Sequence, residues 1–300
     1  MFEQLGLIGC GLMGGSFALA LKKAGLVKRV VGYSKSPTTT ARALQMGVID
    51  LEAPSALLAA AGADLVLMAV PVGATEDTLR SIKQLVTPEM LIMDVGSTKV
   101  DVVQAARRAL GSKISSFVPC HPNTGKEVAG VDHADAELYR GAKVILTPTE
   151  RTLTSHLDKA QALWQALGCE LRVMSPETHD AAFAAISHLP HMLAFAMMHS
   201  VTHQEHTDAY LSVAGPGFRD FTRIAASEPK MWRDILLANK TEVLAQAQQF
   251  KQAVQAFEQV LQAGDAQALE DMITLASAAR AQCRFNQVSP TPAPVTDTVA

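Results

Sequence analysis

The sequence lacks several features that would point directly to particular protein classes. Its four cysteines are widely scattered and form no CxxC pair, so no disulfide framework is expected. The formal net charge is −3, which gives a nucleic-acid partner no electrostatic support. The N-terminus has no basic region typical of a signal peptide, and no apolar run reaches the roughly 18 residues of a membrane span. We therefore expect a cytoplasmic protein.

The first half of the chain alternates between strand-like and helix-like segments. One of them, Leu65–Val70, is almost wholly apolar, as is typical of a parallel strand buried on both faces. Such alternation predicts an α/β Rossmann domain over residues 1–174, with a doubly wound parallel sheet. The predicted strands are Leu5–Ile8, Arg29–Tyr33, Leu65–Val70, Met90–Val95, Ile114–Val118, Lys143–Leu146 and Glu170–Met174. The predicted helices are Gly14–Lys23, Pro37–Met46, Thr75–Leu85, Lys99–Leu110 and Arg151–Leu167.

After Ser175 the strand patterns end, and long segments rich in Ala, Leu and Gln follow. Residues 175–287 are predicted to form an all-α domain. The tail, residues 288–300, is rich in Pro, Thr and Ala and is expected to be disordered. The predicted helices are Pro176–His203, Asp208–Ala214, Gly217–Ala226, Pro229–Gln262 and Ala266–Phe285.

A glycine-rich turn between the first strand and the first helix predicts a dinucleotide site. Gly9 makes the tight turn, Gly11 lets the backbone approach a pyrophosphate, and Gly14 lets the helix pack closely on the strand. Leu12 and Met13 complete the turn. The alternative is a glycine-rich turn that binds no ligand.

The cofactor is predicted from the end of the second strand. An NAD site usually has an acidic residue there for the ribose, but this sequence has Ser34, Lys35 and Ser36. A hydroxyl beside an ammonium suits a 2′-phosphate, so NADP is favoured over NAD. If Lys35 is only a solvated surface residue, NAD remains possible. Val70 and Pro71, at the end of a buried strand, are predicted to line the nicotinamide side.

Two polar residues follow later strands of the same predicted sheet. The carboxyl ends of parallel strands share one edge, so Ser97 and His121 should lie near the nicotinamide. A histidine can take a proton at neutral pH, as oxidation of an alcohol requires. Ser97 or Thr98 could instead cap the following helix, and His121 could be a structural residue of a turn.

The helical half contributes further candidates. His188 and His191 are three residues apart, so they are neighbours on a helix, and His179 lies a little over three turns upstream of His191. A metal site is not expected, because there is no HExxH motif and no matching set of carboxylates. Arg219 follows a Gly-Pro-Gly turn and could reach into a cleft to bind a carboxylate. The alternatives are a structural role for His188 and a surface ion pair for the arginine.

Together these segments resemble the prephenate dehydrogenase family, also called cyclohexadienyl or arogenate dehydrogenases. The resemblance covers about residues 3–287. The usual HPMAGSE motif of the family is altered at Asn123, Thr124 and Lys126, which concerns substrate preference rather than reaction type. The matching segments are Gly9–Ser16, Asp94–Lys99, His121–Glu127, His179–Asp180, Ser187–His191, Gly215–Ala225 and Pro229–Lys240.

The resemblance implies oxidative decarboxylation of prephenate or L-arogenate in tyrosine biosynthesis, with hydride transfer to NAD(P)+. His121 would accept the proton of the ring hydroxyl, Ser97 would orient that pair, and Arg219 would bind a substrate carboxylate. His188 and His191 would lie near the substrate side chain, with His179 and Glu127 as further polar groups. The helical domain would form a homodimer.

Two other interpretations remain open. One is a two-domain β-hydroxyacid dehydrogenase, although such enzymes typically use a catalytic lysine from the helical domain. The other is a dimer that senses NADP(H) without catalysis, which would need neither a base nor a carboxylate-binding arginine.

Overall fold

The computed structural model describes residues 1–126 and 128–283, which form two compact units. The first unit covers residues 1–246 and the second begins at Ala247. Glu127 and the tail predicted to be disordered, 288–300, lie outside the described residues. The predicted domain boundary near residue 174 stays a prediction.

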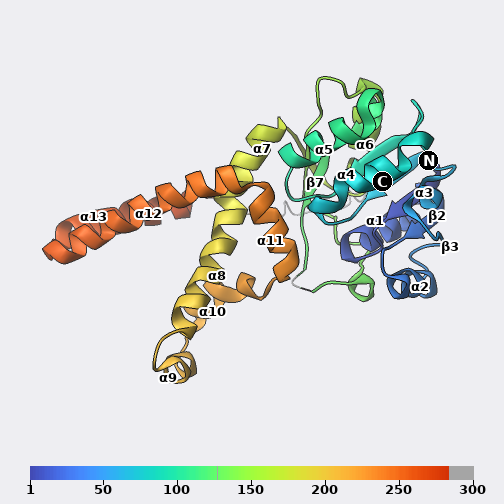
Figure 1. The fold of residues 1–300 in the computed structure, drawn as a ribbon. Helices are drawn as coiled ribbons and strands as arrows, with labels where there is room; N and C mark the ends of the chain where they lie inside the picture. The colour runs from blue at the N-terminus through green and yellow to red at the C-terminus, as the bar shows by residue number, and fades with distance from the viewer. Residues whose placement is uncertain (127, 284–300) are drawn as a thin grey trace, which may run out of the picture. The chain divides into compact units, whose positions relative to one another are not determined.

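A six-stranded parallel sheet forms the centre of the first unit, with strand order β3-β2-β1-β4-β5-β6. After β3 the chain crosses back to the other side of β1 and continues with β4, so strands are added outward first on one side of β1 and then on the other. This is the doubly wound arrangement. The predicted fold class is therefore confirmed (Figure 1). The strands are β1 (Phe2–Ile8), β2 (Val27–Tyr33), β3 (Leu51–Glu52), β4 (Leu65–Met68), β5 (Leu91–Asp94) and β6 (Phe117–Val118).

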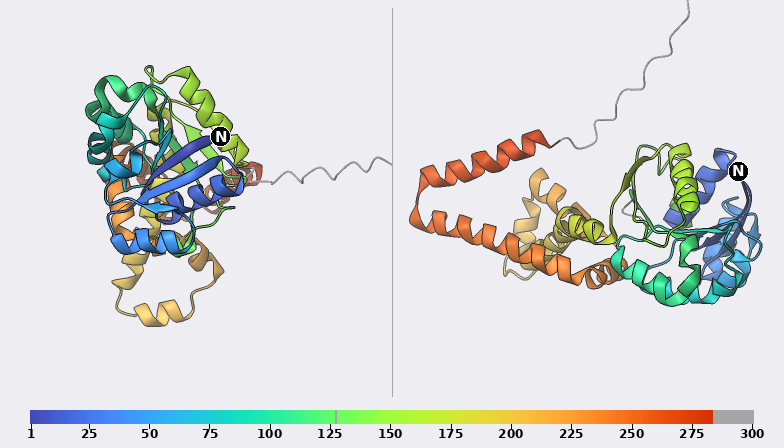
Figure 2. Two further views of the ribbon diagram at one scale, coloured as in Figure 1. Left: turned by 90° about the vertical axis from the view of Figure 1, so that its right-hand side faces the viewer. Right: turned by 90° about the horizontal axis from the view of Figure 1, so that it is seen from above.

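Side chains of the central strands point alternately into two apolar cores, one on each face of the sheet. In β4, Leu65 and Leu67 enter one core, and Val66 and Met68 enter the other. The left view of Figure 2 shows helices on both sides of the strands. The first core receives α1 (Leu12–Lys23), α2 (Pro37–Gln45) and α6 (Thr154–Ala166). The second receives α3 (Ala56–Ala60), α4 (Thr75–Ile82) and α5 (Val100–Leu110).

Two predicted strands belong to a separate sheet, which corrects the sequence interpretation. Lys143–Leu146 forms β8, which pairs antiparallel with β7 (Cys120–Asn123) and parallel with β9 (Glu170–Val173). The sequence analysis placed His121 just after the strand Ile114–Val118, outside any strand. The chain instead changes sheets at Pro119, and His121 lies inside β7. The short elements β3 and α3 were not predicted.

The rest of the first unit is helical, as expected. The helical run 176–202 consists of α7 (Pro176–Phe183), the π-helical turn η5 (Ala184–His188) and α8 (Leu189–Thr202). By length and composition it could cross a membrane, with a mean hydropathy of 1.4, which the sequence analysis did not expect. Its buried Asp180 nevertheless bonds the N-terminus of α5, a contact within a folded domain. The absence of a membrane stays a prediction.

Shorter helices follow, and two of them, α10 and α11, have a proline in their first turn. Pro229 lies at the start of α11, and the Glu228 carboxylate accepts a hydrogen bond from the Met231 N–H. α11 packs against the 3₁₀ turn η1 (Val72–Ala74), which follows β4. These helices are α9 (Thr207–Ser212), α10 (Pro216–Thr222), the 3₁₀ turn η6 (Arg223–Ala226) and α11 (Pro229–Ala238).

The last two helices are α12 (Lys240–Ala263), which runs on into the second unit, and α13 (Ala266–Gln282). Gly264 ends α12 with φ +66°, a backbone conformation that favours glycine. Asp265 then caps α13, because its carboxylate accepts the Ala268 N–H at 3.0 Å.

Candidate active site

The glycine-rich turn has the shape that a dinucleotide needs. Gly9 has φ +101°, and a Cβ there would collide with the Ala69 carbonyl. A Cβ on Gly14 would collide with the Gly9 carbonyl, so α1 can lie this close to β1 only with glycine. Beside Gly11, by contrast, nothing lies within 4 Å of the position of a Cβ. This open space at the N-terminus of α1 fits a pyrophosphate.

The end of β2 is tied to the same turn. The Cys10 N–H donates to Ser34 Oγ at 2.8 Å, and the Gly9 N–H donates to the Tyr33 carbonyl at 2.7 Å. Lys35 and Ser36 are exposed beside this contact. Burial raises the pKa of the Cys10 thiol to about 11, the hydrogen bond to Ser34 opposes this shift, and the charge of Glu52 adds to it. The sequence analysis missed Glu52, at the end of β3. The glycine-rich turn therefore has Lys35 and the Glu52 carboxylate in its neighbourhood.

The carboxyl ends of β4, β5 and β6 lie side by side in the sheet, and the chain segments that leave them carry Val70 and Pro71, Ser97 and His121. A buried ion pair fixes the backbone here. Lys99 Nζ lies 2.5 Å from Asp94 Oδ2 and donates to the Cys120 carbonyl at 2.7 Å, and both charged side chains are almost completely buried.

The same ion pair also binds the backbone N–H of Cys120. Asp94 Oδ1 accepts the Cys120 N–H at 3.0 Å. Asp94 thus accepts a hydrogen bond from the backbone N–H of Cys120, and Lys99 donates one to its carbonyl. The position of the imidazole depends on this pair.

Asp180 and His179 orient the ring of His121. The two backbone N–H groups at the start of α5, those of Lys99 and Val100, donate to the Asp180 carboxylate at 2.8 and 2.9 Å. Asp180 therefore caps α5, rather than Ser97 or Thr98. Its Oδ1 also lies 2.8 Å from His179 Nδ1, and His179 Nε2 lies 2.8 Å from His121 Nδ1.

The hydrogen positions along this chain follow from Asp180. A carboxylate only accepts, so His179 Nδ1 carries a proton and His179 Nε2 accepts. His121 Nδ1 must then donate, which leaves the lone pair of a neutral His121 on Nε2. We refer to this His121–His179–Asp180 chain as the histidine relay.

Burial keeps the relay histidines neutral. Desolvation lowers the pKa of His121 well below 6.5, and the nearby His179, Lys99 and His188 act in the same direction. Desolvation also lowers the pKa of His179, although its hydrogen bond to Asp180 opposes the shift. A neutral ring with a lone pair on Nε2 can act as a base.

The π-helical turn and the start of α8 carry a second pair of histidines. His191 stacks on Trp232 of α11 with ring centroids 3.6 Å apart, and its Nδ1 donates to the Ser187 carbonyl at 2.9 Å. His188 is completely buried, and Asn239 donates to its Nδ1 at 3.1 Å. His188 and the relay are linked by Phe183, whose ring contacts His121, His179 and His188.

Comparisons with known proteins identify the family to which this chain belongs. The model of the nucleotide-binding domain of prephenate dehydrogenase matches residues 17–173, and the model of its dimerization domain matches residues 175–275. The chain belongs to the prephenate dehydrogenase family.

Individual family members cover most of the chain. The prephenate dehydrogenase of Bacillus subtilis is 40% identical over 249 residues, 81% of this chain and 66% of that protein. The cyclohexadienyl dehydrogenase of Zymomonas mobilis is 35% identical over 81% of this chain and 83% of that protein. The crystal structure of the Aquifex aeolicus prephenate dehydrogenase, in complex with hydroxyphenyl propionate and NAD+, has a TM-score of 0.87 and 33% identity. It covers 94% of this chain and 98% of that chain.

Membership of the prephenate dehydrogenase family confirms that the chain is an oxidoreductase with a nicotinamide cofactor. The names of its relatives also support the function predicted from the sequence, NAD(P)-dependent oxidative decarboxylation in tyrosine biosynthesis. The roles of individual residues stay predictions.

The structure brings together most, but not all, of the predicted site residues. His121, His179 and His188 lie within one cluster, and His191 adjoins it through Trp232. Arg219 is exposed on α10, and among the described residues no hydrogen bond or ion pair joins it to these histidines. Burial lowers the pKa of His191, and the charge of Arg223, one turn after Arg219, acts in the same direction.

Sequence reasoning missed the residues that orient the site. Asp180, Lys99 and Asn239 were noticed only as parts of motifs. Within residues 1–126 and 128–283, no group of three or more His, Cys, Asp or Glu side chains could hold a metal ion. The absence of a metal stays a prediction.

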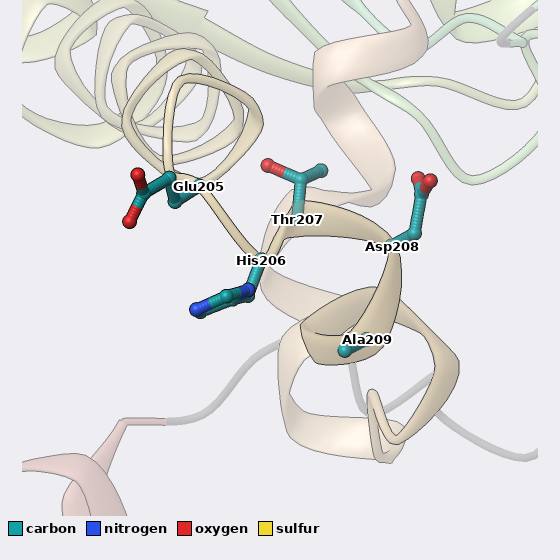
Figure 3. Close-up of a pocket in the computed structure, with 5 residues that line it drawn as sticks. All are labelled: Glu205, His206, Thr207, Asp208 and Ala209. Carbon is teal, nitrogen blue, oxygen red and sulfur yellow. The ribbon is translucent and has the colours of Figure 1, made fainter.

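A separate hollow lies at the turn between α8 and α9 and has a volume of about 310 Å³ (Figure 3). It is lined by five consecutive residues, Glu205–Ala209, whose side chains point in different directions. None of the predicted site residues lines it, so we assign it no role in the reaction.

Proposed function

We propose that the chain oxidatively decarboxylates prephenate or L-arogenate, with His121 as the general base. The relay carries this proposal. Its buried, neutral imidazole follows the carboxyl end of a parallel strand, at the edge of the sheet where Rossmann folds bind their ligands. Family membership supports the choice of reaction.

In this proposal the relay moves one proton. His121 Nε2 accepts the proton of the ring hydroxyl, and the ring carbon that carries this hydroxyl gives up its hydrogen as a hydride, for which a bound nicotinamide would be the acceptor. Loss of the ring carboxylate as carbon dioxide leaves the bonding electrons in the ring, which becomes aromatic. The phenolate oxygen then takes the proton back from His121, so the enzyme ends unchanged. Ser97, half-buried after β5, is proposed to orient the hydroxyl.

The relay also stabilises the charge that forms on His121. The imidazolium donates from Nδ1 to His179, and His179 donates to the Asp180 carboxylate, so the positive charge faces a negative one. Lys99 has the opposite effect, because its buried ammonium favours the neutral ring. The relay allows His121 to accept a proton, and Lys99 favours its return to the neutral form, so the charged state is short-lived.

An arginine is proposed to bind the carboxylate of the substrate side chain. The sequence favours Arg219, which is exposed on α10. Arg223 is a second candidate, because its charge reaches His191. We propose that one of the two binds the carboxylate and that His191 lies beside it. Glu127 keeps its predicted role as a further polar group.

NADP is proposed as the favoured cofactor, and NAD as the alternative. The Ser34 oxygen accepts a hydrogen bond from the Cys10 N–H, so its O–H can still donate to a ligand. Lys35 is exposed and can bind a 2′-phosphate. Glu52 opposes this preference, because a carboxylate near the ribose repels a phosphate and suits a 2′-hydroxyl. The cofactor preference depends on the balance of these two charges.

A homodimer is proposed through the helical part. The matching family model is described as a dimerization domain. Large apolar side chains are exposed on its helices, among them Ile186, Leu237 and Leu244 in the first unit and Leu275 in the second. Sedimentation equilibrium would test this proposal, and a monomer at all accessible concentrations would contradict it.

The direct test is an initial-rate assay of both substrates with both cofactors, followed by formation of the reduced nicotinamide. We expect His121→Asn to lower kcat by about 10²- to 10⁴-fold with little change in KM, because it removes the general base. Replacement by alanine of the arginine that binds the carboxylate should mainly raise KM, at a cost of about 2–5 kcal/mol. The other arginine serves as the matched control.

The same assay separates the alternatives. Turnover of a β-hydroxy acid, but not of prephenate or arogenate, would favour a β-hydroxyacid dehydrogenase. Cofactor binding without turnover of any substrate would favour a sensor. If both arginine variants and His121→Asn gave the same kinetic profile, the assignment of roles would be wrong.

A further inference from the structure

Asn239 connects two parts of the site that lie far apart in the sequence. It follows α11 directly, and its side chain is buried, with 5% of its surface exposed. Its amide nitrogen Nδ2 lies 2.8 Å from the backbone carbonyl oxygen of Asp180 and 3.1 Å from Nδ1 of His188. One side chain thus contacts the backbone of α7 and the ring on the π-helical turn.

These two contacts determine which way the amide faces. A backbone carbonyl only accepts hydrogen bonds, so the atom that faces Asp180 must be the NH₂ nitrogen. The second hydrogen of the same nitrogen is then directed at His188 Nδ1, which must accept it. A neutral His188 therefore carries its proton on Nε2.

Among the described residues, no acceptor lies in full hydrogen-bond geometry with that proton. His188 Nε2 is buried without a hydrogen bond, and the ring is completely buried. Its surroundings are the rings of Phe183 and Trp232 and the backbone of Ser97, which lies close enough to raise the pKa of the ring. A buried donor without an acceptor is unfavourable and rare in folded proteins.

The charges around His188 keep the ring neutral. The pKa of His188 is lowered to about 4, mainly by burial; Asp180 opposes this shift, His179 and His191 add to it, and the Ser97 backbone opposes it. At neutral pH the ring therefore presents one donor, Nε2–H. His121 and His191 differ, because Nδ1 carries the proton in each, which leaves Nε2 as an acceptor.

We propose that Asn239 is a positioning residue that holds His188 as an Nε2–H donor, and that this donor binds an oxygen atom of a ligand beside Ser97. The oxygen belongs either to the nicotinamide carboxamide or to the substrate, since both offer carbonyl or carboxylate acceptors. The identity of the ligand rests on the proposed function, whereas the position of the proton rests only on Asn239 and Asp180.

Nitrogen NMR of the full chain with ¹⁵N-labelled histidine tests the proton position without any turnover. The His188 signals are assigned by their loss in His188→Gln. We expect a protonated Nε2 and an unprotonated Nδ1 from neutral pH down to about pH 5. A proton on Nδ1 in the ligand-free protein would overturn the proposal, whether or not the chain is active.

Substitution of Asn239 tests its positioning role. In Asn239→Asp the carboxylate cannot donate to Nδ1, so the ring should move its proton to Nδ1 or become an imidazolium, and either change is visible in the same spectrum. Asn239→Ala should give a mixture of both neutral forms and lower kcat/KM about tenfold. An unchanged His188 spectrum in both variants would show that Asn239 does not set the tautomer.

Ligand additions distinguish the two sources of the oxygen. NADP+ or NAD+ alone should shift the His188 Nε2–H resonance downfield if the acceptor is the carboxamide. If the acceptor belongs to the substrate, the shift should require hydroxyphenyl propionate, a substrate-like aromatic acid. No shift with saturating amounts of both probes would overturn the assignment of a ligand to His188.

Discussion

Acidification should destabilise this protein through His188, and the magnitude follows from its burial. The pKa of His188 is about 4 in the folded chain, against a usual value of 6.5. Below pH 6.5 His188 binds a proton in the unfolded chain but stays neutral in the folded chain. The free energy of unfolding therefore falls as the pH falls. The loss continues to about pH 4 and then stops, and it amounts to about 3 kcal/mol for this one ring.

The assay is urea unfolding at several pH values between 7 and 4, at one protein concentration because a dimer is expected. His188→Gln should remove about 3 kcal/mol of the pH dependence, since glutamine does not titrate. His206→Gln is the matched control, because His206 is exposed at the α8–α9 turn. His121 and His179 have lowered pKa values, so they should leave a remaining slope of the same sign.

One result would refute this reasoning. If wild type and His188→Gln lost stability in parallel between pH 6.5 and 4, His188 would be accessible to protons in the folded state. The buried, neutral donor described above would then not exist. A parallel loss in wild type and His206→Gln, by contrast, is the expected result.

Three further predictions have distinct expected results. Asp180→Asn should lower kcat/KM by about 10²- to 10⁴-fold in the initial-rate assay, because the amide no longer fixes the base-competent form of the relay. Lys99→Met should cost about 3–5 kcal/mol in urea unfolding, since it leaves a buried carboxylate unpaired, whereas Lys28→Met, in an exposed pair, should cost less than about 1 kcal/mol. Lys35→Ala should lower kcat/KM for NADP+ about tenfold and Glu52→Gln should raise it, with smaller effects for NAD+; equal effects on both cofactors would contradict their roles.

The cofactor end of the site could be predicted from the sequence because its requirements are local. A strand, a glycine-rich turn and a helix must follow one another, so the fingerprint at Gly9–Gly14 is readable without the rest of the fold. Glu52 was missed because it reaches the turn from a two-residue strand, and strand pairing is not encoded in so short a segment.

The substrate end was only partly predictable, because its residues act through contacts that are distant in sequence. His121 was recognised, but its relay partner lies 58 residues later, and nothing in the pair His179–Asp180 indicates what it contacts. The sheet assignment failed for a related reason. The strand Lys143–Leu146 is as apolar as those of the parallel sheet, and only its partner, β7, shows that it belongs elsewhere.

Asp180 sets the proton positions on two histidines by different routes. Its carboxylate acts through His179 on His121, and its backbone carbonyl acts through Asn239 on His188. The first route makes His121 Nε2 an acceptor, and the second makes His188 Nε2 a donor. A side-chain substitution breaks only the hydrogen bonds of the first route, so Asp180→Asn should alter the NMR signals of His121 and His179. His188 should stay neutral with its proton on Nε2, because loss of the Asp180 charge removes a contribution that raises its pKa. Loss of both patterns together would show that the two rings respond to the packing of α7 rather than to these separate hydrogen bonds.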